Sequence, residues 1–248
     1  MKLKDRVALI TGSGQGIGKA IALVFAEEGA TIAVNDISFN ESKAMETVKE
    51  LRQLGVKAEL FLADVSQEAE VNSMVEKVIK QFGKVDILVN NAGINRDGLL
   101  HKGNAANWDA VMAVNLTGPF LCTKAVLPSM RGQGYGRIVN LSSLTARMGI
   151  FGTGYYATSK AGLIGLTKVT AAENATKGIT CNALAPGYIN TDMMNKYPED
   201  QLKALIAKIP LGRFAEPKEV ADAALFLAAD DSSYITGAVL DINGGFLI

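Results

Sequence analysis

The 248-residue sequence has few of the residues that build disulfide frameworks and metal sites. It contains two cysteines, Cys122 and Cys181, far apart in the chain, and a single histidine, His101. A disulfide-stapled fold needs several paired cysteines, and a zinc site needs a cluster of cysteine and histidine ligands. The sequence therefore predicts two reduced, buried thiols, no disulfide and no metal site.

The chain also lacks an excess of charge of either sign, with 25 basic and 25 acidic residues. Surfaces that bind nucleic acid are typically basic, so nucleic acid is not an expected partner. No uninterrupted apolar run approaches the roughly 18 residues of a membrane span, and residues 1–6 lead into the first apolar run without a signal-like segment. We therefore expect a cytoplasmic protein that does not enter a membrane.

Glycine, by contrast, is abundant, and several glycines gather near the start of the chain. The apolar run 7–10 stops at Thr11 and Gly12, and from Ile17 onward apolar residues recur at the spacing of a helix with one buried face. Glycines between the two let the backbone approach a ligand, and the first helical N–H groups face that ligand with the positive end of the helix dipole. This stretch therefore predicts a pyrophosphate cradle.

An acidic residue follows the second apolar run. Residues 31–34 lead to Asp36, about 20 residues beyond the glycine loop, where a carboxylate can accept hydrogen bonds from an adenosine ribose. The same carboxylate would repel the 2′-phosphate of NADP(H). The order of strand, glycine turn, helix, strand and acid predicts a dinucleotide site, with NAD(H) preferred and NADP(H) disfavoured.

Apolar runs alternate with helical patterns along the whole chain, and no linker interrupts them. Strands are expected at residues 7–10, 31–34, 57–63, 86–90, 137–141, 179–184 and 238–242. Such alternation predicts an α/β fold with one doubly wound Rossmann domain, residues 1–248, around a parallel sheet of about seven strands. Its ligand site should lie at the carboxyl ends of the strands.

Two segments of this pattern need a separate interpretation. Residues 188–215 lack a strand pattern and hold two X-Pro pairs, Tyr197-Pro198 and Ile209-Pro210, so we expect a substrate lid there. A helix is expected over residues 107–130, with Asn115 facing inward and a kink at Pro119.

Tyr156 and Lys160 are four residues apart in a helical segment, so their side chains share one face. A nearby ammonium favours the phenolate and lowers a phenol pKa from about 10 toward neutrality, which would make Tyr156 a usable acid or base. The alternative is an exposed helix pair worth a few tenths of a kcal/mol. Ser143, at the end of its strand, could donate a hydrogen bond to a substrate oxygen, and Asn115 could hold a water beside Lys160.

Together these motifs resemble the short-chain dehydrogenase/reductase family over essentially the full length, and within it the 3-oxoacyl-[acyl-carrier-protein] reductases. The resemblance rests on Thr11-Gly12 with Gly16 and Gly18, Asp64-Val65, the run Asn90-Asn-Ala-Gly93, Asn115, Ser143, Tyr156 with Lys160, and Pro186-Gly187 with Thr191. It implies an oxidoreductase that interconverts a ketone and a secondary alcohol in a soluble homotetramer.

The resemblance also implies roles for individual residues. The catalytic set would be Ser143, Tyr156, Lys160 and Asn115. Asp64 and Val65 would flank the adenine, Asn91 the adjoining ribose, and Ile189 and Thr191 the carboxamide. The residues expected to bind the cofactor are Gly12, Gln15, Gly16, Ile17, Gly18, Asp36, Asp64, Val65, Asn91, Ala92, Gly93, Tyr156, Lys160, Pro186, Gly187, Ile189 and Thr191.

The substrate stays open at this point. One hypothesis is a 3-oxoacyl thioester carried by acyl carrier protein or by coenzyme A. The local pattern places Gly134 and Ala172 where such reductases carry two arginines that dock the acidic carrier protein, so coenzyme A competes as the carrier. A degradative alcohol, sugar or cyclic-alcohol dehydrogenase is the second hypothesis, and a non-catalytic NAD-binding sensor or scaffold is an alternative of another class.

Overall fold

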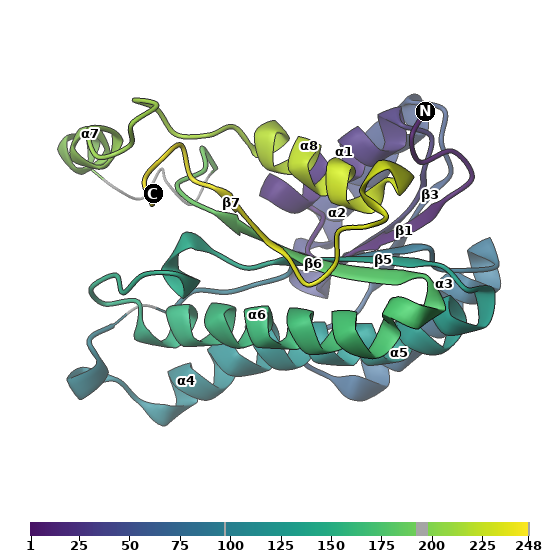
Figure 1. Ribbon diagram of the computed structural model, residues 1–248, viewed down its shortest axis with the longest axis horizontal. Helices are drawn as coiled ribbons and strands as arrows, with labels where there is room; N and C mark the ends of the chain where they lie inside the picture. The colour runs from purple at the N-terminus through teal and green to yellow at the C-terminus, as the bar shows by residue number, and fades with distance from the viewer. Residues whose placement is uncertain (97, 192–197, 248) are drawn as a thin grey trace.

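Seven short apolar runs pair side by side into one parallel sheet in the computed structural model, which describes residues 1–96, 98–191 and 198–247 (Figure 1). The strands are β1 (Val7–Ile10), β2 (Thr31–Asp36), β3 (Ala58–Leu62), β4 (Ile87–Asn90), β5 (Gly136–Leu141), β6 (Ile179–Pro186) and β7 (Val239–Ile242). Their order across the sheet is β3-β2-β1-β4-β5-β6-β7. The predicted doubly wound α/β fold is confirmed.

The central strands are covered on both faces, which explains why their sequences do not alternate regularly between apolar and polar residues. Every residue of β1, β4, β5 and β6 is buried, so these strands have no solvent face that would impose an alternating pattern. From β1 the chain moves outward to β2 and β3, then returns to place β4 on the other side of β1. Such a reversal opens a crevice at the carboxyl ends of β1 and β4, where open α/β sheets bind their ligands.

Helices form a layer on each face of the sheet (Figure 1). The layer with α1, α2 and α8 buries Ile21, Phe25 and Leu51, and the layer with α3, α5 and α6 buries Met74, Val126 and Met130. The bounds are α1 (Gly16–Glu27), α2 (Glu41–Gln53), α3 (Glu68–Phe82), α4 (Ala105–Met112), α5 (Gly118–Gln133), α6 (Gly154–Asn174), α7 (Glu199–Ile206) and α8 (Pro217–Ala228).

The helix predicted over residues 107–130, with a kink at Pro119, is built differently in the structure. The structure has α4, then a π-helical turn at Ala113–Thr117, and then α5, with Pro119 in the first turn of α5. The departure from a regular α-helix lies at this wider turn, which contains Asn115, and π-helical turns are frequent at functional sites.

The predicted lid contains a helix, α7, that was not predicted from the sequence. Residues 192–197 of this segment, which include Tyr197, lie outside the described residues. The two ends of the segment meet in a parallel bridge between Ile189 and Ala215. Residues 188–215 therefore return to the carboxyl edge of the sheet, and their role as a lid stays a prediction.

One helical stretch of the described residues, Ala105–Gln133, is long and apolar enough to pass a length-and-composition test for a membrane span. It is weak support for one, because the core helix of a globular domain passes the same test. Leu121, Cys122, Val126 and Met130 from this stretch pack in the core beneath the sheet.

Candidate active site

The glycine turn between β1 and α1 is packed too tightly for side chains at two positions. A Cβ on Gly12 would lie 2.9 Å from Cα of Ala92, and one on Gly18 would lie 2.4 Å from the carbonyl oxygen of Gly12. Both glycines therefore let the turn lie directly against the end of β4 and the start of α1. A side chain at either position would push the turn out of place.

The front of the same turn is open. Gly16 has a φ of +57°, and the nearest atom that the described residues place beside a Cβ built on it is the methyl group of Thr191, 4.0 Å away across the crevice. Gln15 precedes α1 and makes no side-chain capping bond within the described chain, since its Oε1 accepts a 2.7 Å hydrogen bond from Lys43 Nζ. The first N–H groups of α1 are thus available to an anion, and the residues present fit the pyrophosphate of a dinucleotide.

Asn91 ties the glycine turn to β4. Its Nδ2 donates hydrogen bonds of 2.9 Å to the carbonyl oxygens of both Thr11 and Gly12. Thr11 Oγ1 in turn accepts hydrogen bonds of 3.0 Å from the N–H groups of Asn91 and Ala92. Both amide hydrogens of Asn91 are committed to the turn, so the contact predicted with a ribose would use its side-chain oxygen.

The Asp36 carboxylate is buried and held from three sides. Oδ2 accepts a 3.0 Å hydrogen bond from the N–H of Gly14, and Oδ1 accepts from the N–H of Ile37 at 2.9 Å and from Asn40 Nδ2 at 2.8 Å. Oδ2 keeps acceptor capacity, because each carboxylate oxygen has about two lone-pair sites and only Oδ1 already accepts two hydrogen bonds. The carboxylate is therefore preorganised beside the glycine turn to accept a hydroxyl group of a ribose.

Asp64 and Val65 follow β3, next to β2. Asp64 Oδ1 accepts hydrogen bonds from the N–H and the hydroxyl of Ser66, at 2.9 and 2.8 Å. The Val65 side chain is buried, and its Cγ2 would lie 2.9 Å from a Cβ on Gly118. The Val65 side chain is thus used in the core, so the predicted contact with the adenine would be made by its backbone.

Lys160 is buried between α6 and the end of β5. Its Nζ donates a 2.6 Å hydrogen bond to the carbonyl oxygen of Leu141 and lies 5.6 Å from the centroid of the Tyr156 ring. Desolvation by burial lowers the pKa of Lys160 from 10.5 to about 8, so the ammonium form still dominates near neutral pH. The predicted pairing of Tyr156 with a cation is present, and the exposed helix pair weighed as its alternative is excluded for Lys160, which is 3% exposed.

Gly93 lies beside this cation. A Cβ on Gly93 would be 3.5 Å from Lys160 Nζ and 3.3 Å from Asn115 Oδ1. The end of the Asn90–Gly93 run and the helix that carries Tyr156 therefore meet at one point. The space in front of Gly93 is where the sequence predicts the nicotinamide half of the cofactor.

Asn115 uses its side chain to hold the loop after β4. It accepts a 2.8 Å hydrogen bond from the N–H of Ile94 and donates to the carbonyl oxygen of the same residue at 2.8 Å and to Ser159 Oγ at 3.2 Å. Ser159 Oγ donates to the carbonyl oxygen of Tyr156 at 2.7 Å. Both amide hydrogens of Asn115 are therefore committed, and the water predicted beside Lys160 would be held by an oxygen of Asn115.

Ser143 begins a short 3-10 turn, Leu144–Ala146, directly after β5. Its Oγ accepts hydrogen bonds from the N–H of Thr145 at 3.2 Å and from Thr145 Oγ1 at 3.0 Å. The preceding residue, Ser142, donates from its Oγ to the carbonyl oxygen of Lys160 at 2.9 Å. This contact fixes the end of β5 against the helical turn that carries Lys160.

The loop after β6 completes the crevice. Gly187 donates a 2.9 Å backbone hydrogen bond to Ile242, and a Cβ on Gly187 would lie 3.1 Å from Cα of Asn243. Ile189 is buried, and Thr191 faces the glycine turn as described above. The Pro186–Thr191 segment thus lies across the crevice from the start of α1.

Four side chains that support the site were not identified from the sequence. Asn40 donates a hydrogen bond to Asp36, and Ser142 donates one to the backbone carbonyl oxygen of Lys160. Ser159 accepts a hydrogen bond from Asn115, and Thr145 donates one to Ser143. Of these four residues, only Ser142 had a local signal in the sequence, because it stands next to Ser143 at the end of the same strand. The other contacts join separate segments or depend on a turn whose shape the sequence does not reveal.

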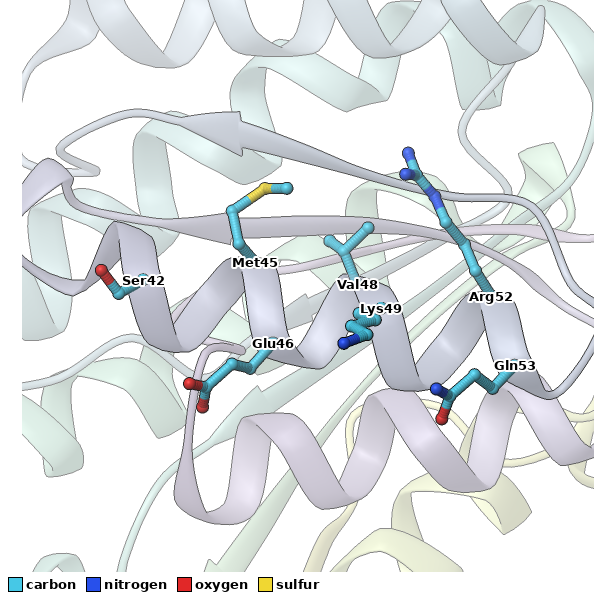
Figure 2. Close-up of a pocket in the computed structure, with 7 residues that line it drawn as sticks. All are labelled: Ser42, Met45, Glu46, Val48, Lys49, Arg52 and Gln53. Carbon is cyan, nitrogen blue, oxygen red and sulfur yellow. The ribbon is translucent and has the colours of Figure 1, made fainter.

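Outside the crevice, side chains of α2 line a groove on the protein (Figure 2). Figure 2 shows Met45, Val48 and Arg52 pointing toward the neighbouring strands, and Arg52 Nε donates a 2.9 Å hydrogen bond to the carbonyl oxygen of Ala58. All the side chains that line the groove belong to this one helix. Among the described residues, no group of three or more His, Cys, Asp and Glu side chains is arranged to hold a metal ion.

Comparisons with known proteins show which proteins the chain is similar to. Residues 12–247 match a family described as "Enoyl-(Acyl carrier protein) reductase". The chain is 47% identical over 248 residues to 3-oxoacyl-[acyl-carrier-protein] reductase FabG of Thermotoga maritima, with all of both chains covered. It is 45% identical over 245 residues to (2S)-[(R)-hydroxy(phenyl)methyl]succinyl-CoA dehydrogenase subunit BbsD of Thauera aromatica, with 99% of this chain and 98% of that protein covered.

Solved structures have the same fold. The chain matches the crystal structure of levodione reductase with a TM-score of 0.93 and 37% identity, covering 98% of each chain. The relatives therefore include proteins named for acyl thioesters and a protein named for a dione.

Proposed function

Because this chain belongs to the short-chain dehydrogenase/reductase family, we propose that it reduces 3-oxoacyl thioesters with NADH. It is an oxidoreductase that acts on the CH–OH group and interconverts a ketone and a secondary alcohol. The observation that carries the proposal is the buried Lys160 ammonium beside Tyr156 at the carboxyl edge of the sheet. A cation in this position would stabilise the phenolate that forms when the phenol gives up its proton.

In the proposed reaction Tyr156 donates its phenolic proton to the ketone oxygen as negative charge develops there. The Lys160 ammonium stabilises the phenolate that remains, and the Ser143 hydroxyl donates a hydrogen bond to the same substrate oxygen. The nicotinamide supplies the hydride to the carbonyl carbon when the cofactor is bound. Hydride and proton together convert the ketone to the secondary alcohol, and the oxidation of an alcohol uses the same groups in reverse.

Support for NADH comes from Asp36. Hydrogen bonds from Gly14, Ile37 and Asn40 fix its carboxylate in a buried position, so the carboxylate cannot turn away from a 2′-phosphate. Two anions brought together out of water repel each other strongly. An adenosine ribose with a free 2′-hydroxyl would instead donate to this carboxylate.

Support for a thioester comes from the relatives and from an apolar wall beside the crevice. Tyr188, directly after Gly187, packs its ring against Phe214 and Phe246, with ring centroids 6.0 and 5.5 Å apart. Such a wall suits an acyl chain better than a polyol. The relatives at 47% and 45% identity are named for a carrier-protein ester and a coenzyme A ester, so both carriers belong in the test.

A panel of substrates tests the proposal. NADH and NADPH oxidation would be measured with acetoacetyl-CoA, an acetoacetyl carrier protein and a set of cyclic ketones. We expect the highest kcat/KM with a thioester and NADH. Equal or better use of NADPH would refute the proposal that NADH is the preferred cofactor. A preference for a cyclic ketone would favour the alternative of a cyclic-alcohol dehydrogenase. Tight NADH binding without turnover of any ketone would favour the sensor or scaffold.

We further propose that the enzyme is a cytoplasmic homotetramer. Large apolar side chains are exposed on outer helices and on the edge strand, namely Phe120 on α5, Val169 on α6, Phe226 on α8 and Leu240 on β7. Burial of such side chains between subunits would remove apolar surface from water. Phe246 does not add to this exposed apolar surface in the same way, because its ring packs against Tyr188 of its own chain. Light scattering would test this, and a monomer would contradict it.

A further inference from the structure

One residue supplies both of the hydrogen bonds that Ser143 Oγ accepts. The N–H of Thr145 donates at 3.2 Å and the Thr145 hydroxyl at 3.0 Å. We propose that Thr145 is a positioning residue, which makes the Ser143 hydroxyl an obligatory hydrogen-bond donor to the substrate oxygen. The inference rests on the proposed function of Ser143, and it adds a residue that the motifs of the sequence do not contain.

A count of donors and acceptors gives the reason. A serine hydroxyl has one hydrogen to donate and two lone pairs that accept. The backbone N–H of Thr145 can only donate, so it fills one lone pair of Ser143 Oγ permanently. When the Thr145 hydroxyl fills the second lone pair, the hydrogen of Ser143 is the only hydrogen-bonding capacity that remains, and an oxygen acceptor is its only suitable partner.

The hydroxyl of Thr145 also adapts to the reaction. Before a substrate is present, a hydrogen bond between two hydroxyl groups can run in either direction, since each group both donates and accepts. A ketone oxygen only accepts, so its arrival draws the hydrogen of Ser143 toward the substrate. The hydrogen of Thr145 then fills the free lone pair of Ser143, which becomes a better donor because chains of hydrogen bonds polarise one another.

The surroundings make this role hard to replace by water. Ser143 is buried, and the 3-10 turn closes with a 3.0 Å hydrogen bond from the N–H of Ala146 to the carbonyl oxygen of Ser143. Ser142 fixes the other side of Ser143 through its hydrogen bond to Lys160. The backbone around Ser143 is thus held at both ends, and only the rotation of its hydroxyl is left to be set by Thr145.

Thr145→Val and Thr145→Ser test the proposal, each in the wild-type protein and in a Ser143→Ala background. Valine keeps the shape and the backbone N–H but removes the hydroxyl, whereas serine restores it. Thr158→Val is the matched control, because it removes a hydroxyl that donates to the carbonyl oxygen of Gly154, on the exposed face of α6. The substrate is whichever ketone the wild type reduces fastest, so the test does not depend on a thioester.

We expect Thr145→Val to lower kcat about tenfold, the effect of one lost hydrogen bond, with KM for NADH unchanged within about twofold. Thr145→Ser should restore kcat. In the Ser143→Ala background, Thr145→Val should have almost no further effect, because the hydroxyl that it positions is gone.

Three results would overturn the proposal: wild-type kcat in Thr145→Val, a loss that persists in the Ser143→Ala background, or a loss that serine does not restore. The second and third results would show that Thr145 only supports the turn. Failure of the proposed function would look different, since the wild-type chain itself would then reduce no ketone.

Discussion

Lys160 Nζ lies 5.6 Å from the centroid of the Tyr156 ring while it donates a 2.6 Å hydrogen bond to the carbonyl oxygen of Leu141. The cation is therefore held between the end of β5 and the first turns of α6, and it cannot move into water. Burial of an ammonium disfavours its charged form, which is why the pKa of Lys160 falls to about 8. At neutral pH the buried ammonium therefore lowers the stability of the folded state, but it places a cation beside the phenol.

That cost predicts a pH-dependent stability difference between the wild type and Lys160→Met. The unfolded chain keeps the Lys160 proton up to about pH 10.5 and the folded chain up to about pH 8, so between these values the unfolded state binds more protons. The contribution of Lys160 to stability therefore rises with pH across this window. We expect the gain in unfolding free energy from Lys160→Met to be about 2 kcal/mol larger at pH 7 than at pH 9.5.

Urea unfolding at the two pH values would measure this difference. Lys168→Met is the matched control, because Lys168 is exposed on the same helix and its ammonium stays in water. Its effect should be the same at both pH values. A pH-independent effect of Lys160→Met would mean that the ammonium is not desolvated in solution.

Asp36→Ser should weaken the preference for NADH over NADPH. The substitution removes the carboxylate that would accept the ribose hydroxyl groups and repel a 2′-phosphate. The variant loses the hydrogen bonds from the ribose to a charged group and the repulsion of the 2′-phosphate. The ratio of kcat/KM with NADH to kcat/KM with NADPH should therefore fall by about 10- to 100-fold. Steady-state kinetics with both cofactors would measure the ratio.

Glu41→Ser is the control for that experiment. Glu41 is exposed at the start of α2, so its replacement removes one negative charge from the same region without touching the carboxylate beside Gly14. A similar change in the ratio for both variants would assign the preference to the net charge of the region, and would contradict a specific role for Asp36.

Gly18→Ala should abolish the cofactor site and destabilise the fold. Its added methyl group would lie 2.4 Å from the Gly12 carbonyl oxygen and 2.5 Å from Asn91 Nδ2, so the glycine turn must move. Overpacking of this kind costs about 1–3 kcal/mol or more. Thermal unfolding and the fluorescence of bound NADH would report the two effects.

Gly132→Ala gives the matched comparison. Gly132 is in α5, and among the described residues no heavy atom lies within 4 Å of a Cβ built there. A stabilisation of about 0.5–1 kcal/mol is expected, because alanine restricts the unfolded chain more than glycine does. NADH binding by Gly18→Ala at wild-type strength would contradict the close packing of the turn.

The sequence predicted the sheet well because strand and helix signals are local. Continuous apolar runs gave the strand positions to within a few residues, and Gly83 marks the end of α3 in the left-handed conformation expected of a helix-ending glycine. The helix α7 was missed although its signals were present. Pro198 precedes it, and Glu199 and Asp200 lie in its first turn, where acidic residues favour a helix start.

Parts of the site could not be predicted, because they depend on contacts between distant segments. The π-helical turn at Ala113–Thr117 places Asn115 against Ile94 and Ser159, and nothing in the residues of the turn itself indicates that packing. Similarly, the proposed role of Thr145 depends on the 3-10 turn after β5. This turn brings the hydroxyl groups of Ser143 and Thr145 to 3.0 Å from each other.

Tyr156→Phe tests the central claim most directly, with Tyr155→Phe as its neighbour and control, since the Tyr155 ring packs edge-on against Trp108. We would measure NADH binding and the rate of ketone reduction for both variants. The account predicts that Tyr156→Phe binds NADH within about twofold of the wild type and loses about 10²- to 10⁴-fold in kcat, while Tyr155→Phe keeps its turnover. A Tyr156→Phe variant that still reduces the ketone at a rate close to the wild type would contradict the account.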